Sequence, residues 1–150
     1  MEVYRISHED YSTKLTSSGS ANRWNFDGRK VIYTGQSRAL SSLELVVHRS
    51  YIKPAEPYKM MIISIADEQQ LYSEIKIASL PANWRKIAAY SDLQKIGSKW
   101  YKSKSSLILK VPSAIIPYES NYIINTEHPD FAKNVRSVRI EDYFWDDRLL

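Results

Sequence analysis

Four polar side chains of this 150-residue sequence have a setting that suits binding or catalysis: an arginine, a tyrosine, a glutamate and a serine. The arginine, Arg23, precedes Trp24 in the segment NRWNFDGRKVIYTGQS, directly after the flexible stretch SSGSAN. Its guanidinium could stack on an aromatic face while its planar fork binds a phosphate. The alternative is a solvent-exposed loop arginine, which is the more common arrangement. Local sequence alone leaves both interpretations open.

The glutamate, Glu44, lies at the margin of the face that a predicted helix should bury. At about 100° per residue, its side chain projects within roughly 40° of Leu40 and Val47. A carboxylate in that position is either desolvated or faces a cleft. The alternative is a capping box from Ser41 to Glu44, which would place Glu44 at the helix start. We prefer Ser37 as the cap, because Leu40 already belongs to the periodic pattern.

The remaining polar candidates lie in or beside predicted strands. Tyr33 is inside a short apolar segment and faces either the core or a cleft. Ser113, in VPSAIIP, follows a strand between two prolines that favour turns. It is therefore either a turn residue or a donor aimed into a pocket. By local pattern, Asn121 and Asn125 are strand-end residues around the apolar segment YII.

Hydrophobic periodicity predicts the strands that must position these residues. The segment at residues 58–65, YKMMIISI, has apolar side chains at nearly every position. This pattern predicts a strand at the centre of the sheet, covered on both faces. The full set of predicted strands is Val3–Ser7, Lys30–Gly35, Tyr58–Ile65, Leu107–Val111, Asn121–Asn125 and Val135–Ile140.

Two longer helices and one short helix are predicted. The first covers residues 37–51, SRALSSLELVVHRSY, with Ser37 as its N-cap. The second covers residues 91–103, and Ser91 with Gln94 has the capping-box pattern. A short helix is predicted to start at Pro129. The apolar faces expected to be buried are Leu40, Leu43, Val46 and Val47 on the first helix and Leu93, Ile96 and Trp100 on the second.

These elements alternate irregularly, and several predicted strands lack the connection length that parallel pairing needs. The fold class is therefore α+β: one compact domain, residues 1–150, with a central, mostly antiparallel sheet and flanking helices. The length suits one domain with a real core, and 43% hydrophobic residues is ordinary for a soluble globular protein.

Composition and missing motifs exclude several classes of function. There is no cysteine, and the histidines at positions 8, 48 and 128 are isolated, so no metal site is expected. Neither a dinucleotide fingerprint, nor a P-loop, nor a GxSxG elbow is present. No run approaches the roughly 18 apolar residues of a membrane span, and the N-terminus does not resemble a signal peptide. A cytoplasmic protein is expected.

The net charge of +4 is mild, and the basic residues are scattered. The densest basic patch, residues 85–104, has aromatics between its charges, which would suit a nucleic-acid surface. A helix with a solvated basic face is the commoner explanation. A non-catalytic nucleic-acid-binding module is therefore kept as an alternative function of another class, while direct nucleic-acid binding is not expected.

Taken together, the motifs resemble those of the RES domain family, the toxin half of bacterial type II toxin–antitoxin systems. The first family signature is similar to NRWNFDGRKVIYTGQSRALSSLELVVH in this chain, and the second to LILKVPSAIIPYESNYIINTEHPDF. Between and after them, LPANW, IGSKW and FWDDRL also match family landmarks. The resemblance covers nearly the whole chain, and several motifs in the same order make it specific.

One departure from the family pattern precedes Arg23. Where the family commonly has a glycine pair, this chain has Ala21 and Asn22. Asparagine tolerates left-handed backbone better than most residues, so the turn is expected to be kept.

The resemblance implies an enzyme that consumes NAD as a substrate, with no separate cofactor and a core similar to ADP-ribosyltransferase toxins. Such toxins cleave the bond between nicotinamide and ribose. Because nicotinamide is a good leaving group and the transition state is oxocarbenium-like, catalysis needs positioning and a nearby negative charge. Hydrolysis or phosphorolysis would deplete NAD and arrest growth. The alternative is ADP-ribosyl transfer to a protein.

The resemblance also assigns residues and a partner. Arg23 would hold the pyrophosphate or the nicotinamide ribose, and Tyr33 would contact the nicotinamide end. Glu44 would bond a ribose hydroxyl and stabilise the cation, or it would orient the attacking water or phosphate. Ser113 would hydrogen-bond in the same pocket. Trp24, Asn25 and Asn121 complete the expected NAD-binding set. The implied partner is an antitoxin with a DNA-binding part of the Xre helix-turn-helix type, which would cover the pocket.

Overall fold

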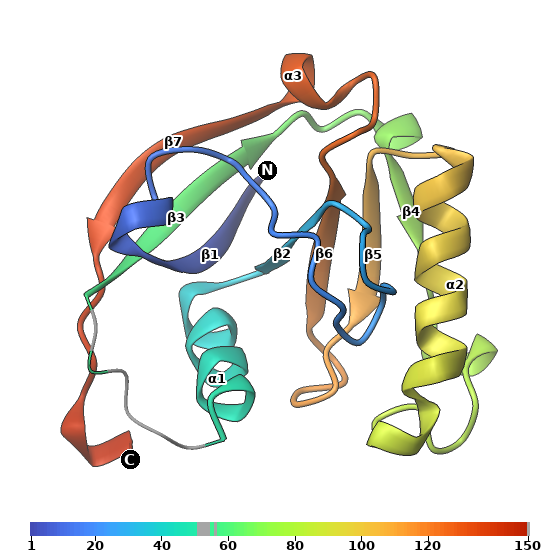
Figure 1. Cartoon of the computed structure of the whole chain (residues 1–150), viewed down its shortest axis with the longest axis horizontal. Coiled ribbons are helices and arrows are strands. Elements are labelled where there is room, and N and C mark those ends of the chain that lie inside the picture. Colours follow the sequence, from blue (N-terminus) through green and yellow to red (C-terminus); the bar gives the residue numbers. More distant parts are fainter. Residues whose placement is uncertain (51–54, 56, 150) are drawn as a thin grey trace.

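Within residues 1–50, 55 and 57–149, which the computed structural model describes, seven strands form one sheet (Figure 1). Their order is β4-β5-β6-β2-β1-β3-β7. Every pairing is antiparallel except that of β4 with β5, which confirms the predicted α+β class and the mostly antiparallel sheet. The strands are β1 (Glu2–His8), β2 (Val31–Gly35), β3 (Tyr58–Ile65), β4 (Tyr72–Glu74), β5 (Ile108–Pro112), β6 (Ser120–Asn125) and β7 (Val135–Asp142).

The helices of the described residues are α1 (Arg38–His48), α2 (Tyr90–Ser103) and α3 (Phe131–Asn134). Single 3₁₀ turns occur at Glu9–Tyr11, Gln69–Leu71, Ile77–Ser79, Ile87–Ala89 and Asp147–Leu149. None of these helices combines the length and the apolar character of a bilayer-spanning segment.

All six predicted strands are present, with ends that agree within two residues. The structure adds β4, whose three residues are too few to give a periodic signal. The prediction for β3 is confirmed in one respect and wrong in another. Met60 to Ile63 are at most 3% exposed, so both faces are covered, yet β3 lies next to the edge strand β7. An apolar run reports burial of both faces, and it does not report how many strands lie on each side.

Helix α1 begins as predicted, because the Ser37 hydroxyl accepts a hydrogen bond from the Leu40 amide. The predicted buried face is partly wrong: Leu43 and Val47 are 38% and 46% exposed. Helix α1 contacts β1 and β2 through a narrower face, so these two side chains lie at its border. The end of the predicted helix at residue 51 falls outside the described residues.

Helix α2 begins at Tyr90, so Ser91 is inside the helix and the predicted capping box is wrong. The Gln94 side chain instead donates to the Asn22 carbonyl, at 3.0 Å. Leu93 and Trp100 are buried as predicted, whereas Ile96 is 37% exposed. The buried face continues through two small residues, Gly97 and Ser98, instead of through Ile96. The short third helix begins at Phe131, two residues after the predicted Pro129.

The sheet divides between β1 and β2, where a single residue pair, Tyr4 with Gly35, joins the two strands. In Figure 1, β1, β3 and β7 run at an angle to β4, β5 and β6, and β2 lies between the two groups. A hydrophobic core with side chains from both parts lies there, including Val3, Met61, Ile32 and Ile124.

A second core lies between α2 and the β2–β6–β5 part of the sheet. It contains Trp24, Val31, Trp84, Leu93, Trp100, Leu109, Val111 and Ile123. Trp24 comes from a loop and not from a helix or strand, and only 3% of it is exposed. The indole therefore anchors the loop that carries Arg23 to the core beneath α2.

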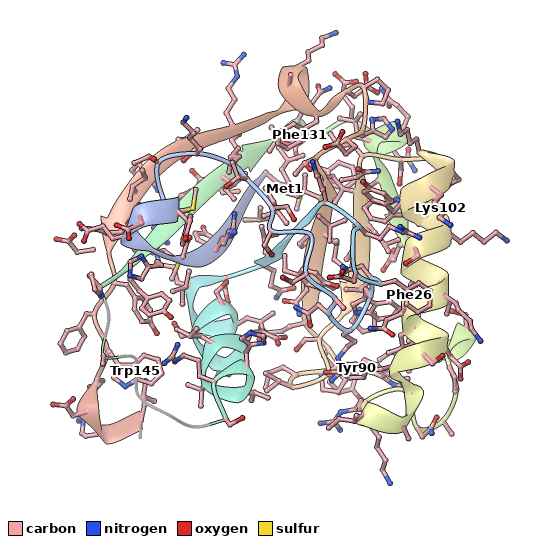
Figure 2. All side chains as sticks on the ribbon, in the orientation of Figure 1. Met1, Phe26, Tyr90, Lys102, Phe131 and Trp145 are labelled. Carbon is pink, nitrogen blue, oxygen red and sulfur yellow. The ribbon has the colours of Figure 1, made fainter. Side chains whose placement is uncertain are left out.

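Helix α2 and this loop are in direct backbone contact at Gly97. A Cβ atom at Gly97 would lie 1.7 Å from the Trp24 carbonyl oxygen. Next to it, the Phe26 amide donates to the Ser98 hydroxyl, at 3.1 Å. Figure 2 shows Phe26 between the sheet and α2. The position of the Arg23 loop thus depends on a helix residue without a side chain.

We predict that Gly97→Ala lowers the free energy of unfolding, although alanine has the higher helix propensity. The methyl group meets backbone, which cannot yield as a flexible side chain can, and overpacking of this kind costs about 1–3 kcal/mol. Urea denaturation of the variant measures the loss. Lys99→Ala, at an exposed position of the same helix, is the matched control. A Gly97→Ala protein as stable as wild type would show that the loop and helix do not need this close contact.

Candidate active site

A pocket of about 510 Å³ opens where β1 separates from β2. Its walls come from β1, β2, α1, the loop before β2, the start of α2 and the β5–β6 connection. Five of the seven predicted site residues are in its lining, whereas Asn25 and Ser113 are not. The five are Arg23, Trp24, Tyr33, Glu44 and Asn121.

A tight turn presents Arg23 to this pocket. The backbones of Asn22 and Asn25 exchange two hydrogen bonds, of 3.1 and 3.2 Å, so Arg23 and Trp24 occupy the tip. The Asn22 side-chain oxygen also accepts from the Arg23 amide, at 2.8 Å. Asn22 does not have a positive φ, so the turn makes no use of left-handed backbone at this position. The expected reason for tolerating asparagine here is therefore wrong, and the turn itself is kept.

The guanidinium of Arg23 stacks on an aromatic ring, but on a different one from its sequence neighbour. Its Cζ atom lies 4.7 Å from the centre of the Tyr90 ring. The Trp24 indole is instead packed in the core with α2. Nη1 of Arg23 donates to the carbonyl oxygens of Trp84 and Arg85, at 3.1 and 3.2 Å.

The hydroxyl of Tyr33 supports the same turn. It accepts a hydrogen bond from the Trp24 amide, at 3.0 Å, and donates one to Oδ1 of Asn25, at 2.7 Å. Burial raises the pKa of this hydroxyl far above its usual value near 10. Tyr33 therefore stays neutral and contributes a ring to the pocket wall, while Asn25, 1% exposed, fixes the loop from behind.

The carboxylate of Glu44 is held by two hydrogen-bond donors that lie far from it in the sequence. Its Oε1 accepts from the Ser113 hydroxyl at 3.0 Å and from the Asn121 side-chain amide at 2.6 Å. In the part of the chain that the structure describes, nothing donates to Oε2. One carboxylate oxygen is thus fixed, and the other is available to a ligand.

Ser113 is completely buried and acts within the protein. Besides donating to Glu44, its hydroxyl oxygen accepts from the backbone amides of Ile115 and Ile116, both at 3.1 Å. With these three bonds the hydroxyl is fully used. The structure thus places Ser113 where it orients Glu44 and shapes the turn after β5.

Asn121 has an incomplete set of partners. Its amide nitrogen donates to Glu44, whereas its buried Oδ1 has no hydrogen-bond partner among the described residues. A buried polar atom without a partner is costly, and a bound ligand or water at this position would supply the missing hydrogen bond.

Among the pocket residues that the sequence did not single out, Tyr90 and Arg5 have side chains suited to binding a ligand. Arg5 is on β1, and its Nη1 donates to the Thr16 carbonyl at 3.0 Å. Burial lowers the pKa of its guanidinium, which nevertheless remains charged at neutral pH. In the sequence, Arg5 stands inside the predicted strand Val3–Ser7, and nothing else there distinguishes it from an ordinary strand residue.

Neither Arg5 nor Arg23 forms an ion pair with a carboxylate in the described ranges. The pocket therefore combines two guanidinium groups whose charge is not neutralised with one oriented carboxylate. Such an arrangement suits a ligand that is anionic in one part and develops positive charge in another during reaction.

We predict that Tyr33→Phe destabilises the protein, because the Trp24 amide and Asn25 Oδ1 both lose their partner. The cost of two such groups is about 1–3 kcal/mol, measured by urea denaturation at neutral pH. The difference should shrink at high pH. A raised folded-state pKa gives stability that is present below pH ~10 and lost as pH rises further, when unfolded tyrosine ionises. Equal stability of both proteins at neutral pH would contradict this role of the hydroxyl.

The family comparison is specific. The RES domain model matches residues 2–146. A protein of Photorhabdus laumondii named "Toxin Res" is 32% identical over 154 residues, covering 100% of this chain and 97% of that protein. Another "Toxin Res", of Yersinia enterocolitica, is 32% identical and covers 99% of both chains. A Sphingobium protein named "Prs ADP-ribosylating toxin" is 35% identical, with 87% of this chain and 81% of that protein covered. The chain belongs to the RES domain family.

Proposed function

We propose that the protein is the toxin of a bacterial type II toxin–antitoxin system and cleaves the bond between nicotinamide and ribose in NAD. The observation that carries the proposal is the oriented carboxylate of Glu44 in one pocket with Arg5 and Arg23. NAD offers the matching chemistry, because its pyrophosphate is anionic and its ribose becomes cationic during the reaction. The names of the relatives and the family resemblance support the same choice.

In the proposed reaction, the bond between ribose C1′ and the nicotinamide nitrogen breaks, and nicotinamide leaves with the bonding electron pair. The positive charge then lies on C1′ and the ring oxygen of the ribose. Glu44 stabilises this charge, and its Oε2 accepts a hydrogen bond from a ribose hydroxyl. Ser113 and Asn121 keep the carboxylate in place before the reaction, so reorientation adds no cost to the barrier.

The acceptor that attacks C1′ decides the biological outcome. Water gives ADP-ribose and a released proton, while phosphate gives the phosphate ester of ADP-ribose. Either reaction consumes NAD, and its depletion arrests growth. Transfer to a side chain of another protein is the second candidate, and the name of the Sphingobium relative, an ADP-ribosylating toxin, favours it.

The partner in this proposal is an antitoxin of the Xre helix-turn-helix type that covers the pocket. The exposed border of α1 supports contact with a protein. Val47, 46% exposed, is in the pocket lining, and Leu43, 38% exposed, lies one turn before it on the helix. Binding of the antitoxin should therefore prevent NAD from entering. A complex that cleaves NAD as fast as the isolated toxin would contradict this part of the proposal.

The products identify the reaction. The purified chain, incubated with NAD in buffers with and without phosphate and with a cell lysate, should release nicotinamide. Free ADP-ribose indicates hydrolysis, its phosphate ester indicates phosphorolysis, and labelled protein from radioactive NAD indicates transfer. No nicotinamide release by the folded protein in any of these conditions would refute both candidates. Steeply salt-dependent DNA or RNA binding with NAD intact would favour the nucleic-acid-binding alternative.

Two substitutions test the site. Glu44→Gln keeps an oxygen that can accept from Ser113 and Asn121 but removes the charge, so nicotinamide release should fall by about a hundredfold or more. Arg23→Ala should raise the KM for NAD so far that expression of the variant no longer arrests growth. Circular dichroism and thermal unfolding show whether both variants are folded. Variants that are folded and fully toxic would show that the site is assigned incorrectly.

A further inference from the structure

One short segment, residues 84–90, fixes the guanidinium of Arg23. Two carbonyl oxygens at its start accept hydrogen bonds from Nη1, and the ring of Tyr90 at its end lies 4.7 Å from Cζ. All of these groups are neutral. A carboxylate in the same place would compensate the charge of Arg23. These neutral groups hold the guanidinium in position and leave its charge uncompensated.

These contacts leave one edge of the guanidinium available. The two carbonyl oxygens occupy Nη1, whereas Nε and Nη2 form no hydrogen bond with residues in the ranges 1–50 and 57–149. The edge formed by Nε and Nη2 is a pair of parallel donors that matches two oxygens of a phosphate group. Nη1 is thus used for positioning and the opposite edge for a ligand.

Tyr90 is anchored firmly beside the guanidinium of Arg23. It is the first residue of α2 and lines the pocket. Ala89 before it and Leu93 one turn later are 1% and 0% exposed, so the start of the helix is anchored in the core. The Tyr90 hydroxyl makes no hydrogen bond to a described residue, which leaves the face of the ring as the part that contacts Arg23. Figure 2 labels Tyr90 at this end of α2.

We propose that Tyr90 is a positioning residue for substrate binding: its ring holds Arg23 by a cation–π contact so that Nε and Nη2 bind the pyrophosphate of the substrate. This inference rests on the proposed function. Because the pyrophosphate does not change during bond cleavage, the contact acts on binding and not on the chemical step.

Tyr90→Leu tests the proposal in the full-length chain. It keeps an apolar side chain of moderate size and removes the aromatic face. We expect the KM for NAD to rise about three- to tenfold, the value of one partly exposed cation–π contact, with kcat within twofold of wild type. Tyr90→Phe, which keeps the ring, should restore the KM. Tyr11→Leu, at a position 65% exposed and outside the pocket lining, is the matched control.

Coupling to Arg23 separates positioning from a general structural effect. In an Arg23→Ala background, Tyr90→Leu should leave the KM unchanged, because the cation that the ring positions is already absent. A structural role of Tyr90 would raise the KM by the same factor in both backgrounds and would overturn the proposal. A Tyr90→Leu protein with the wild-type KM would overturn it as well, while NAD cleavage itself remained established.

Titration calorimetry with inorganic pyrophosphate decides the question independently of catalysis. Tyr90→Leu should weaken pyrophosphate binding about three- to tenfold, and Tyr90→Phe should recover it. If wild type releases no nicotinamide from NAD, the proposed function fails, and the pyrophosphate affinities alone judge the inference. Equal affinities in wild type and Tyr90→Leu would overturn it.

Discussion

The site depends on one shared oxygen atom, Oε1 of Glu44. It accepts hydrogen bonds from Ser113, after β5, and from Asn121, on β6. This oxygen therefore connects α1 to the part of the sheet that β5 and β6 form. The helix reaches this position only because it packs closely on the end of β2. A Cβ atom on Gly35 would lie 2.6 Å from the Ser41 hydroxyl, which itself donates to the Tyr4 carbonyl of β1. The carboxylate is thus oriented by the packing of α1 as much as by its hydrogen bonds.

The cations of the pocket follow a different physical rule. Glu44 is an anion satisfied by donors, whereas Arg5 and Arg23 are held by carbonyl oxygens, and Arg23 also by an aromatic face. Ion pairs with carboxylates would have oriented both arginines equally well. They would also have compensated the charge that an anionic substrate must meet, and the substrate would then have had to displace them. Neutral partners orient an arginine and leave its charge to the ligand.

Sequence periodicity predicted the strands and the starting cap of α1 because these features depend on neighbouring residues. It failed where contacts between distant segments decide. Ser91 fits a capping box, yet α2 begins at Tyr90 and Gln94 binds the Asn22 carbonyl. The sequence left open whether Arg23 stacks on an aromatic face, and its neighbour Trp24 was the ring at hand. That ring is buried under α2, and the distant Tyr90 stacks on Arg23 instead. Arg5 showed no motif of its own, and only the separation of β1 from β2 reveals that it lines a pocket.

Contacts between distant segments also explain why the turn that carries Arg23 tolerates Asn22 in place of the family glycine. The turn has ordinary backbone at this position, so it needs no residue with special conformational freedom. Its position comes instead from contacts beyond the turn: the Tyr33 hydroxyl on the Trp24 amide, Gln94 on the Asn22 carbonyl, and the Trp24 indole in the core. The glycine that this arrangement requires is Gly97, more than seventy residues away in α2, where the helix meets the Trp24 carbonyl. The loop that carries the substrate-binding arginine is therefore defined by tertiary packing.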